Sequence, residues 1–504
     1  MVSKDSAVST VLSRAPLGLS APLVRVEVHL AGGLPTFVVV GLPETVVRES
    51  RERVRSALVT AGFDFPMMRI TVNLSPADLP KAGGRFDLPI ALGILAAHGQ
   101  LPARSLRRRE FYGELSLAGD LRETPMLLPA LLAGSRAGRE LFLPAANGLE
   151  ASLIAGAQLR LATHLREICE ALRGRPNLSG PPPAPSAAEP PPPDLADIRG
   201  QFAAKRALEI AASGEHGLLL VGPPGAGKTL LAQRLPGLLP PLEAAEALEV
   251  ASVESAAGRR PGAGRRRPFR HPQHTASVAS LIGGSHLRPG ELSLAHRGVL
   301  FLDELPEFAR DALEALREPL ESGVVILARA RSTCEFPACF QLVAAMNPCA
   351  CGYHGDPQGR CHCTAGQVAR YRGRVSGPLL DRIDIHVELA GVGADDLVSD
   401  APSIIEGSAA VAARVAAARR LQLERQGKLN ARLSAAETAR ICRLDRRSRA
   451  LLGAAISRLG LSARAYSRVL KLARTCADLA AVAQIESVHV AEAIQLRALD
   501  RPIG

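Results

Sequence analysis

The segment from Gly222 to Thr229 has the residue types and the spacing of a phosphate-binding loop. Backbone amides in such a glycine-rich turn can surround the phosphates of a nucleotide, while the lysine reaches the β- and γ-phosphates and the threonine hydroxyl can bind Mg²⁺. Apolar residues 218–221 before the loop predict a strand, and residues 230–234 after it predict a helix. The sequence therefore predicts a site for ATP or GTP with Mg²⁺. The loop reads G-x-x-x-x-G-K-T and consists of Gly222, Pro223, Pro224, Gly225, Ala226, Gly227, Lys228 and Thr229.

Two adjacent acidic residues close a second apolar run downstream of this loop. Residues 298–302 predict a buried strand, and Asp303 and Glu304 follow it directly. In this position Asp303 would help to hold Mg²⁺, and Glu304 would polarise the attacking water. Hydrolysis of the bound triphosphate is therefore expected, not binding alone. The alternative is a surface strand that ends in acidic residues.

Four of the nine cysteines form two C-x-C pairs, which are Cys349 with Cys351 and Cys361 with Cys363. A turn-rich loop between the pairs could close four thiolates around a tetrahedral Zn²⁺. In a reducing compartment a metal site is favoured over disulfides. Unliganded buried thiols are the alternative, and His362 is a spare ligand candidate.

The length and composition describe a globular protein of several domains. The chain has 504 residues, of which 47% are hydrophobic and 22% are charged, enough apolar residues for two to four cores. No uncharged apolar run is long enough to span a bilayer, and the first residues lack the layout of a secretory signal. We therefore expect a cytoplasmic protein without a membrane partner.

The charge balance favours a polyanionic partner such as nucleic acid. Lys and Arg number 61 against 49 Asp and Glu, which gives a net charge of +12. The chain has no Trp and only 3% aromatic residues, so phosphate contacts would have to replace base stacking. High arginine usage can also reflect genomic composition. The densest basic segment is a Gly- and Pro-broken loop between the two nucleotide motifs, and its candidate DNA contacts are Arg265, Arg266, Arg267 and Arg270. A solvated basic loop is the alternative.

A proline-rich segment at 181–193 marks the clearest boundary along the chain. Such a segment runs as a semi-rigid spacer, or less commonly serves as a ligand for a partner domain. Before it, residues 24–30 and 69–74 predict strands, while 49–58 and 88–97 predict helices, which indicates an α+β domain. We expect an N-terminal domain at 1–175, a linker at 176–196, a nucleotide-binding core at 197–393 and a helical bundle or lid at 394–504.

Several motifs together resemble an AAA+ ATPase, and the match is closest to the ComM/YifB family, which is related to the magnesium-chelatase motor subunit. The resemblance covers nearly the whole chain and implies a multidomain α/β fold with an AAA+ P-loop core and a C-terminal helical lid. It is carried by D-I-R-G-Q at 197–201, the acidic pair at 303–304 with E-L-S-L-A-H-R-G before it, A-A-M-N-P at 344–348 with C-A-C-G-Y after it, G-P-L-L-D-R-I-D at 377–384, V-R-S-A-L at 54–58 and N-L-S-P-A-D-L-P at 73–80.

The resemblance implies roles for individual residues. Asn347 matches sensor 1 and would orient the attacking water near the γ-phosphate. Arg382 matches the arginine finger and would reach the ATP of a neighbouring subunit. Arg464 is similar to sensor 2, although Arg468 is close enough in sequence to compete for that role. Gln273 replaces a histidine of the family's Pro-His-His-Thr pattern, so the resemblance assigns it no role.

The family resemblance also implies ATP and Mg²⁺ as cofactors and a homohexameric ring as the assembly. It implies helicase and branch-migration activity on single-stranded or branched DNA during natural transformation. Two alternatives share the same ATPase core, namely a chelatase-type motor and a protein-remodelling ATPase that acts on a protein partner.

Residues 1 to about 172 resemble a Lon-type proteolytic domain through D-L-P-K-A-G-G at 78–84 and G-E-L-S-L-A-G at 113–119. A Ser/Lys peptidase needs a hydroxyl nucleophile and a lysine that can lose its proton nearby. Arg85 and Leu128 occupy the positions of that serine and lysine. The Lon-protease-like domain is therefore expected to be proteolytically inactive and to act as a scaffold.

Overall fold

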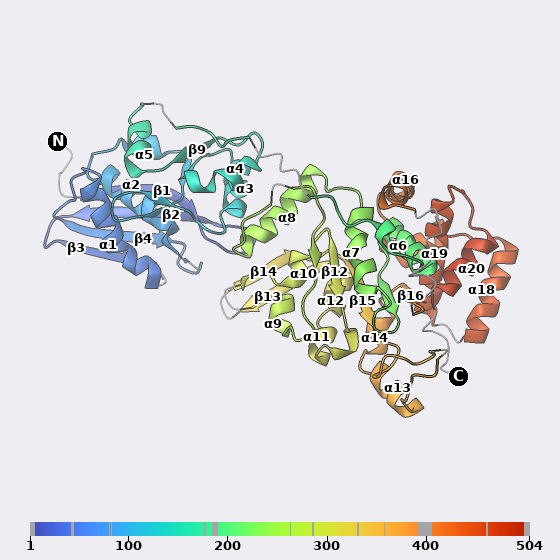
Figure 1. Ribbon diagram of the computed structural model, residues 1–504. Helices are drawn as coiled ribbons and strands as arrows, with labels where there is room; N and C mark the ends of the chain where they lie inside the picture. Colours follow the sequence, from blue (N-terminus) through green and yellow to red (C-terminus); the bar gives the residue numbers. More distant parts are fainter. Residues whose placement is uncertain are drawn as a thin grey trace.

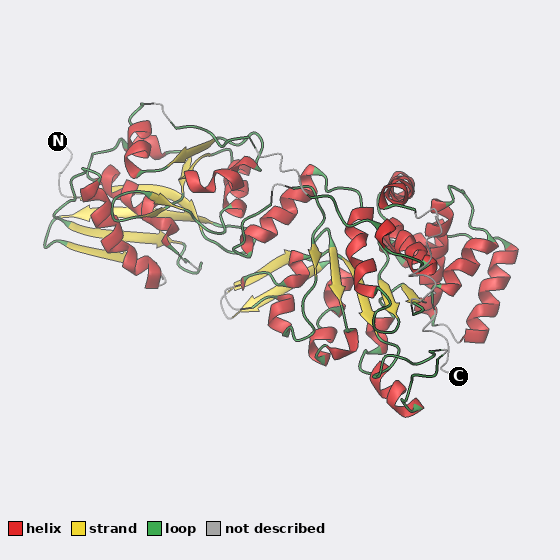
Figure 2. Ribbon diagram, viewed as in Figure 1, coloured by secondary structure: helices red, strands yellow, loops and turns green. Residues whose placement is uncertain are grey.

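The chain folds into an N-terminal α+β part, a central parallel sheet and a C-terminal group of helices, which follow one another across the molecule (Figure 1; Figure 2). The middle of the expected linker, at 184–189, and the expected boundary at 393 lie outside the described residues. No described helix is both long enough and apolar enough to cross a membrane. The computed structural model describes residues 6–41, 45–79, 81, 83–175, 178–183, 190–262, 264–284, 287–329, 332–356, 358–391, 406–459 and 462–497.

The N-terminal part contains a mixed seven-stranded sheet in the order β3-β4-β2-β1-β5-β8-β9. Helix α2 lies in its core and is buried from Asp87 to Ala96. The strands and helices expected from the sequence in this region are confirmed. The elements are β1 Ser6–Arg14, β2 Leu23–Ala31, β3 Thr36–Val40, α1 Thr45–Thr60, β4 Arg69–Ser75, α2 Asp87–Ala97, β5 Arg109–Phe111, α3 Leu128–Arg136, β8 Glu140–Pro144, α4 Gly148–Ser152, β9 Leu159–Ala162 and α5 Leu165–Leu172, with a small hairpin of β6 Glu114–Leu115 and β7 Leu121–Arg122.

The central sheet has five strands in the order β11-β12-β15-β10-β16, and its strand pairs are parallel. Its inner strands are continuous apolar runs because helices cover both faces. Along β10, Leu218 and Leu220 pack on one face and Leu219 and Val221 on the other. The strands are β10 Leu218–Val221, β11 Phe269–Arg270, β12 Val299–Leu302, β15 Gln341–Met346 and β16 Ile385–Glu388, and a separate antiparallel hairpin joins β13 Val324–Arg329 to β14 Ser332–Pro337.

Two groups of helices cover the central sheet. Helices α6 and α7 pack on one face together with α16 and α19 of the C-terminal part, whereas α9 to α12 and α14 contribute to the other core. The helices of the central part are α6 Phe202–Gly214, α7 Lys228–Leu238, α8 Ala244–Ala256, α9 Val278–Ile282, α10 Glu291–Leu294, α11 Arg310–Glu314, α12 Arg317–Ser322, α13 Ala365–Arg372 and α14 Gly377–Leu380.

The C-terminal part is helical, as the spacing of its apolar residues predicts. Its described helices are α16 Ser408–Gln426, α17 Ala435–Ile441, α18 Arg446–Leu459, α19 Ala463–Leu479 and α20 Ser487–Gln495. Helix α19 begins at a regular N-cap, where the side chain of Ser462 accepts a hydrogen bond from the amide of Ala465. We call this part the lid.

Helix α8 joins the central part to the N-terminal part (Figure 1). The Ser255 hydroxyl donates a hydrogen bond of 2.5 Å to Glu150 and accepts one of 3.2 Å from the backbone amide of Leu128. Leu248 and Ala251 of the same helix pack into the apolar cluster around α3. The N-terminal part is therefore docked on the central part by buried apolar and polar contacts.

Candidate nucleotide site

The phosphate loop lies between the end of β10 and the start of α7, at the carboxyl edge of the parallel sheet. Gly225 and Gly227 have φ values of 79° and 85°, a left-handed conformation that favours glycine. A Cβ atom on Gly222 would come within 2.9 Å of the Cβ of Leu389, so this position has no room for a side chain. The glycines of the motif thus give the loop a shape in which backbone amides can approach a ligand.

The ammonium group of Lys228 is held at the centre of this loop. It donates hydrogen bonds to the carbonyl oxygens of Gly222 and Pro223 at 2.6 and 3.0 Å, and to Oδ1 of Asn347 at 3.0 Å. Burial lowers the pKa of Lys228, and the nearby charges of Asp303 and Glu304 act in the opposite direction. The structure therefore brings the loop lysine and the sensor 1 candidate into direct contact.

The acidic pair ends β12 beside the same loop. Thr229 Oγ1 donates a hydrogen bond of 2.7 Å to Asp303, and the other carboxylate oxygen of Asp303 accepts one of 2.9 Å from the amide of Glu304. A hydroxyl and a carboxylate at this distance fit a Mg²⁺ ion that binds oxygen ligands. Glu304 has a φ of 52°, and its carboxylate is about half exposed. This carboxylate forms no hydrogen bond with Lys228, which bonds instead to Gly222, Pro223 and Asn347.

These residues surround a cavity of about 380 Å³, a size that suits a small-molecule ligand. Its wall is formed by residues 224–230, Asp303, Glu304, Met346 and Asn347. His274 contacts the rim, because its Nδ1 lies 3.2 Å from a carboxylate oxygen of Glu304. His274 is a contact that the sequence did not predict, and its place in a stretch that contains histidines is the signal that could have found it.

The arginine finger candidate and the two rival candidates for sensor 2 line a second cavity, of about 400 Å³, between the central sheet and the lid. This cavity contains Arg382, Arg464 and Arg468, and its wall includes no residue of the phosphate loop. Arg382 is bonded to the carbonyl of Pro378 at 2.7 Å and to the carboxylate of Glu321. Glu321 is thus a partner of the finger candidate that the sequence did not reveal.

The two sensor 2 candidates have different surroundings. Arg468 donates a hydrogen bond of 2.6 Å to Asp384, whereas Arg464 is exposed and has no ion-pair partner in the described part of the chain. Asp384 also contacts the buried His216 at 3.0 Å. Burial by itself would raise the pKa of Asp384, but the hydrogen bond with His216 and the charge of Arg468 lower it well below its usual value. Arg468 is therefore engaged within the protein, and Arg464 is available to a ligand.

The four cysteines of the two C-x-C pairs converge after β15. Their sulfur atoms all lie within 4.8 Å of one another, and three of the separations are 3.3, 3.6 and 3.8 Å. Backbone hydrogen bonding lowers the pKa of Cys351 to about 6, which favours a thiolate. The donor set fits tetrahedral Zn²⁺. A Cβ atom on Gly352 would lie 2.7 Å from the ring of Pro224, so the cysteine loop touches the phosphate loop.

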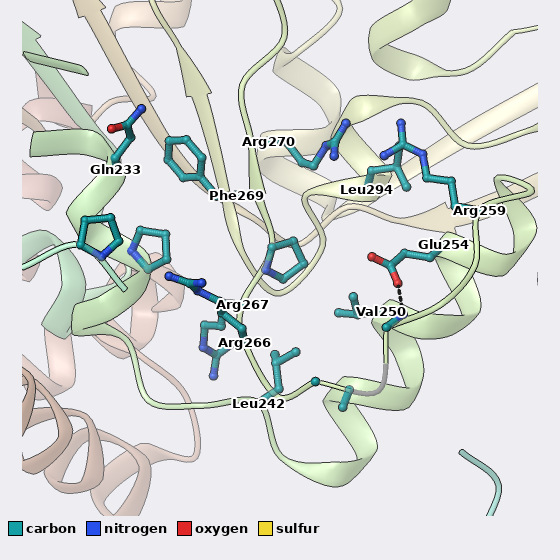
Figure 3. Close-up of a pocket in the computed structure, with 16 residues that line it drawn as sticks. Gln233, Leu242, Val250, Glu254, Arg259, Arg266, Arg267, Phe269, Arg270 and Leu294 are labelled. Carbon is teal, nitrogen blue, oxygen red and sulfur yellow. Dashed lines mark hydrogen bonds between the residues drawn. The ribbon is translucent and has the colours of Figure 1, made fainter. Parts of the chain in front are cut away.

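The basic segment at 259–270, which we call the arginine loop, lines a third cavity, of about 490 Å³ (Figure 3). Arg267 is half-buried and bonded to Glu246, and Arg270 makes two hydrogen bonds to Glu291 at 2.6 and 2.8 Å. Arg265 and Arg266 are exposed. Phe269 and Arg270 form a short edge strand beside β12 where the sequence predicted a loop, because the parallel register to Val299 and Leu300 is a tertiary contact. Two of the four DNA candidates thus have carboxylate partners.

Arg85 and Leu128, the two positions that the sequence resemblance compares with a peptidase serine and lysine, lie near each other in the N-terminal part. Arg85 is buried and donates hydrogen bonds to the carbonyls of Pro125 and Met126 at 2.6 and 3.4 Å. Burial lowers the pKa of Arg85 to about 10, so it stays charged at neutral pH. Leu128 is also buried, and its amide bonds to Glu150. Neither side chain supplies a nucleophile or a base.

Comparisons with known proteins agree with this arrangement. Residues 194–397 match the family described as magnesium chelatase, subunit ChlI, while residues 26–147 and 405–497 match a ChlI subunit family and the ChlI C-terminal family.

The chain is 48% identical over 505 residues to the competence protein ComM of Haemophilus influenzae, which covers 97% of each chain. It is 47% identical over 496 residues to YifB of Escherichia coli, 98% of this chain and 97% of the relative. The 67 kDa magnesium-chelatase subunit of Heliobacterium mobile is 27% identical over 242 residues, or 41% and 34% of the two chains. The chain therefore belongs to the ComM/YifB family of magnesium-chelatase-like proteins.

Proposed function

We propose that this protein is an ATP-driven DNA motor that assembles as a homohexameric ring. The main observation in support is the group formed by Lys228, Thr229, Asp303 and Asn347 at the ends of three strands. Lys228 contacts Asn347 at 3.0 Å, and Thr229 contacts Asp303 at 2.7 Å. ATP with Mg²⁺ would bind there, and Glu304 at the rim would polarise the attacking water. Membership of an AAA+ family supports hydrolysis at this site.

The second cavity supports catalysis between subunits. Arg382 and Arg464 lie together there, and neither lines the cavity of the phosphate loop. In the proposed ring, Arg382 leaves Glu321 and reaches the γ-phosphate bound by a neighbour, while Arg464 acts as sensor 2 on the same nucleotide. A cation at that point stabilises the charge that develops in the transition state. Each nucleotide site would then be complete only in the assembly.

DNA is the proposed substrate because of the net positive charge and the name of a close relative. The chain carries +12, and a relative that is 48% identical over 97% of its length is a competence protein. Phosphate contacts from the exposed Arg265 and Arg266 support strand displacement or branch migration of incoming DNA. Arg267 and Arg270 would join them only by exchanging Glu246 and Glu291 for phosphate.

The remaining parts would support this motor. We infer a structural Zn²⁺ held by Cys349, Cys351, Cys361 and Cys363, which would stabilise the loop that touches Pro224. We also propose that the N-terminal part is an inactive Lon-protease-like scaffold and that the protein acts in the cytoplasm. A chelatase-type or protein-remodelling ATPase is the alternative that shares the same nucleotide site.

The decisive experiment measures ATP hydrolysis by the purified chain with single-stranded DNA, branched DNA, unfolded polypeptide and no addition, across a salt series. Stimulation by DNA that weakens with salt supports the DNA motor. Stimulation by polypeptide and not by DNA would replace the proposal with protein remodelling. Native mass spectrometry with ATP and Mg²⁺ tests the ring, and a strictly monomeric protein at full activity would contradict it.

A further inference from the structure

The positive charge of this chain is concentrated in the lid. Residues 407–497 contain 17 Lys and Arg but only six Asp and Glu, a net charge of +11, compared with +12 for the whole chain. The rest of the sequence is therefore close to neutral. An excess of this kind in one part of the chain is not explained by high arginine usage along the whole chain.

The lid cations that face the central sheet or the interior have partners within the protein. Arg425 bonds to Asp478 at 2.7 Å, and Arg432 bonds to Glu215 at 2.9 Å. Arg414 contacts Glu209 at 2.5 Å. These arginines stabilise the packing of the lid, so they are not available to an outside partner.

Six arginines between the end of α17 and the end of α18 differ from those. All six are exposed, and none forms an ion pair within the described part of the chain. The side chain of Arg449 donates a hydrogen bond of 3.3 Å to the carbonyl of Leu444. The single acidic residue among them, Asp445, accepts a hydrogen bond of 2.7 Å from the amide of Ser448 at the start of α18. We call this set the lid arginine patch: Arg440, Arg443, Arg446, Arg447, Arg449 and Arg458.

The position of α18 presents these side chains to the outside. Helix α18 packs through Leu452 and Ser448, the latter with its hydroxyl 3.3 Å from that of Ser487 at the start of α20. Successive residues of an α-helix are rotated by about 100° around its axis, so Arg446, Arg447 and Arg458 lie on the half of α18 that faces away from Ser448 and Leu452. Figure 1 shows α18 at the end of the molecule farthest from the N-terminal part.

We propose that the lid arginine patch binds the sugar-phosphate backbone of duplex DNA. The proposal rests on the proposed DNA motor and names the surface that holds the duplex. Arginine presents a planar set of donors that matches phosphate, and every cation of the patch is an arginine. From Arg446 to Arg458 the helix extends about 18 Å, a length over which duplex DNA carries about ten phosphates.

Two other features favour a duplex backbone over other polyanions. The patch contains no aromatic residue, so it lacks the stacking surface that single-stranded binders use. Among the large apolar side chains of α18 that the structure describes, Leu452 and Ile456 pack in the lid and only Leu451 is exposed, which is too little apolar surface to enter a lipid bilayer. In contrast to the arginine loop, whose Arg267 and Arg270 pair with carboxylates, the patch loses no internal ion pair when it binds.

The test compares two triple variants of the full-length protein. The lid variant is Arg446→Gln, Arg447→Gln, Arg458→Gln, and the matched control is Arg104→Gln, Arg107→Gln, Arg136→Gln, three exposed arginines of the N-terminal part. Binding of a short blunt-ended duplex is measured with a non-hydrolysable ATP analogue from about 50 to about 200 mM salt. The lid variant should bind at least about tenfold more weakly, with a plot of log K against log salt that is shallower by about 2 to 3.

A charge-retaining variant separates phosphate binding from folding. Arg446→Lys, Arg447→Lys, Arg458→Lys should recover most of the salt dependence, because counterion release follows charge. Basal ATPase activity without DNA should be the same in all three variants.

If wild-type protein binds the duplex and the lid variant binds it equally with the same salt dependence, the proposal is wrong. The proposal would also be overturned if the lid variant lost binding to anionic phospholipid vesicles while its DNA binding stayed unchanged. That result would indicate that the patch binds a membrane surface. If wild-type protein does not bind DNA at all, the proposed motor itself is wrong.

Discussion

The hydrogen bond of 3.0 Å between Lys228 and Asn347 connects the first turn of α7 to the end of β15. The two residues are 119 positions apart in the chain and meet because β10 and β15 are neighbours in the parallel sheet. Lys228 also bonds to two loop carbonyls, which are the contacts that a phosphate group would replace. The candidate nucleotide site is therefore a single unit whose lysine already faces the sensor 1 candidate.

Replacing the loop lysine should abolish activity. We expect Lys228→Ala to hydrolyse ATP at the background rate, because no other cation lines the phosphate-loop cavity in the described structure. The measurement is steady-state ATPase with and without DNA. The exposed Arg136 of the N-terminal part offers a control cation, and Arg136→Ala should leave the rate unchanged. Normal hydrolysis by Lys228→Ala would refute the assignment of the site.

Glu304→Gln should separate binding from hydrolysis. The side chain keeps its size but cannot polarise water, so ATP affinity should stay within about threefold while turnover falls by about a hundredfold or more. Fluorescent-nucleotide titration and single-turnover kinetics measure the two effects. Loss of nucleotide binding instead would indicate a structural role at the end of β12. Glu335→Gln, on the exposed face of β14, is the matched control.

Arg382→Ala should act on the neighbouring subunit. We expect normal ATP binding with turnover reduced by about a thousandfold, the effect of losing an arginine finger. Mixing Arg382→Ala with Lys228→Ala should restore part of the activity, because one subunit then supplies the arginine and the other supplies the intact phosphate loop. ATPase activity across mixing ratios is the readout, and activity that never exceeds that of either variant would contradict action in trans.

The cysteine cluster should hold one zinc ion per chain. Elemental analysis of the purified protein should detect it, and Cys361→Ser should remove most of it, whereas Cys339→Ser, outside the cluster, should not. Because the cysteine loop contacts Pro224, loss of zinc should also weaken ATP binding several-fold. Metal-free protein with full nucleotide affinity would show that the four thiols have no metal role.

Asp384 should stabilise the lid in a pH-dependent way. Its pKa is lowered on folding, so its contribution is complete at neutral pH and declines as the pH falls below about 4, the usual pKa of an aspartate. We expect Asp384→Asn to lower the free energy of unfolding by about 3 kcal/mol at pH 7, because His216 and Arg468 lose a buried carboxylate partner. Denaturant unfolding at pH 7 and at pH values below about 4 measures this, and a difference that grows as the pH falls would contradict it.

Much of the nucleotide site could be predicted because its signals are local. The loop glycines, Lys228 and Thr229 occupy eight consecutive positions, and Asp303 directly follows a strand that is apolar because both its faces are covered. Two strands and two helices of the N-terminal part, β2, β4, α1 and α2, follow from apolar spacing in the same way. The arginine loop shows the limit of such reasoning, because its composition predicts exposure, yet carboxylates from α8 and α10 engage Arg267 and Arg270.

By itself, the sequence determined the strands and helices that flank the nucleotide motifs, the phosphate loop, the acidic pair and the two C-x-C pairs, since each depends on neighbours within a few residues. Only the tertiary structure decided that Arg464 is exposed while Arg468 is held by Asp384, and that both lie with Arg382 away from the phosphate loop. It also decided the contacts of His274 with Glu304 and of Arg382 with Glu321. The physical reason is that an ion pair depends on the distance between two side chains, and parallel strands bring together residues that are remote in the chain, such as His216 and Asp384, 168 positions apart.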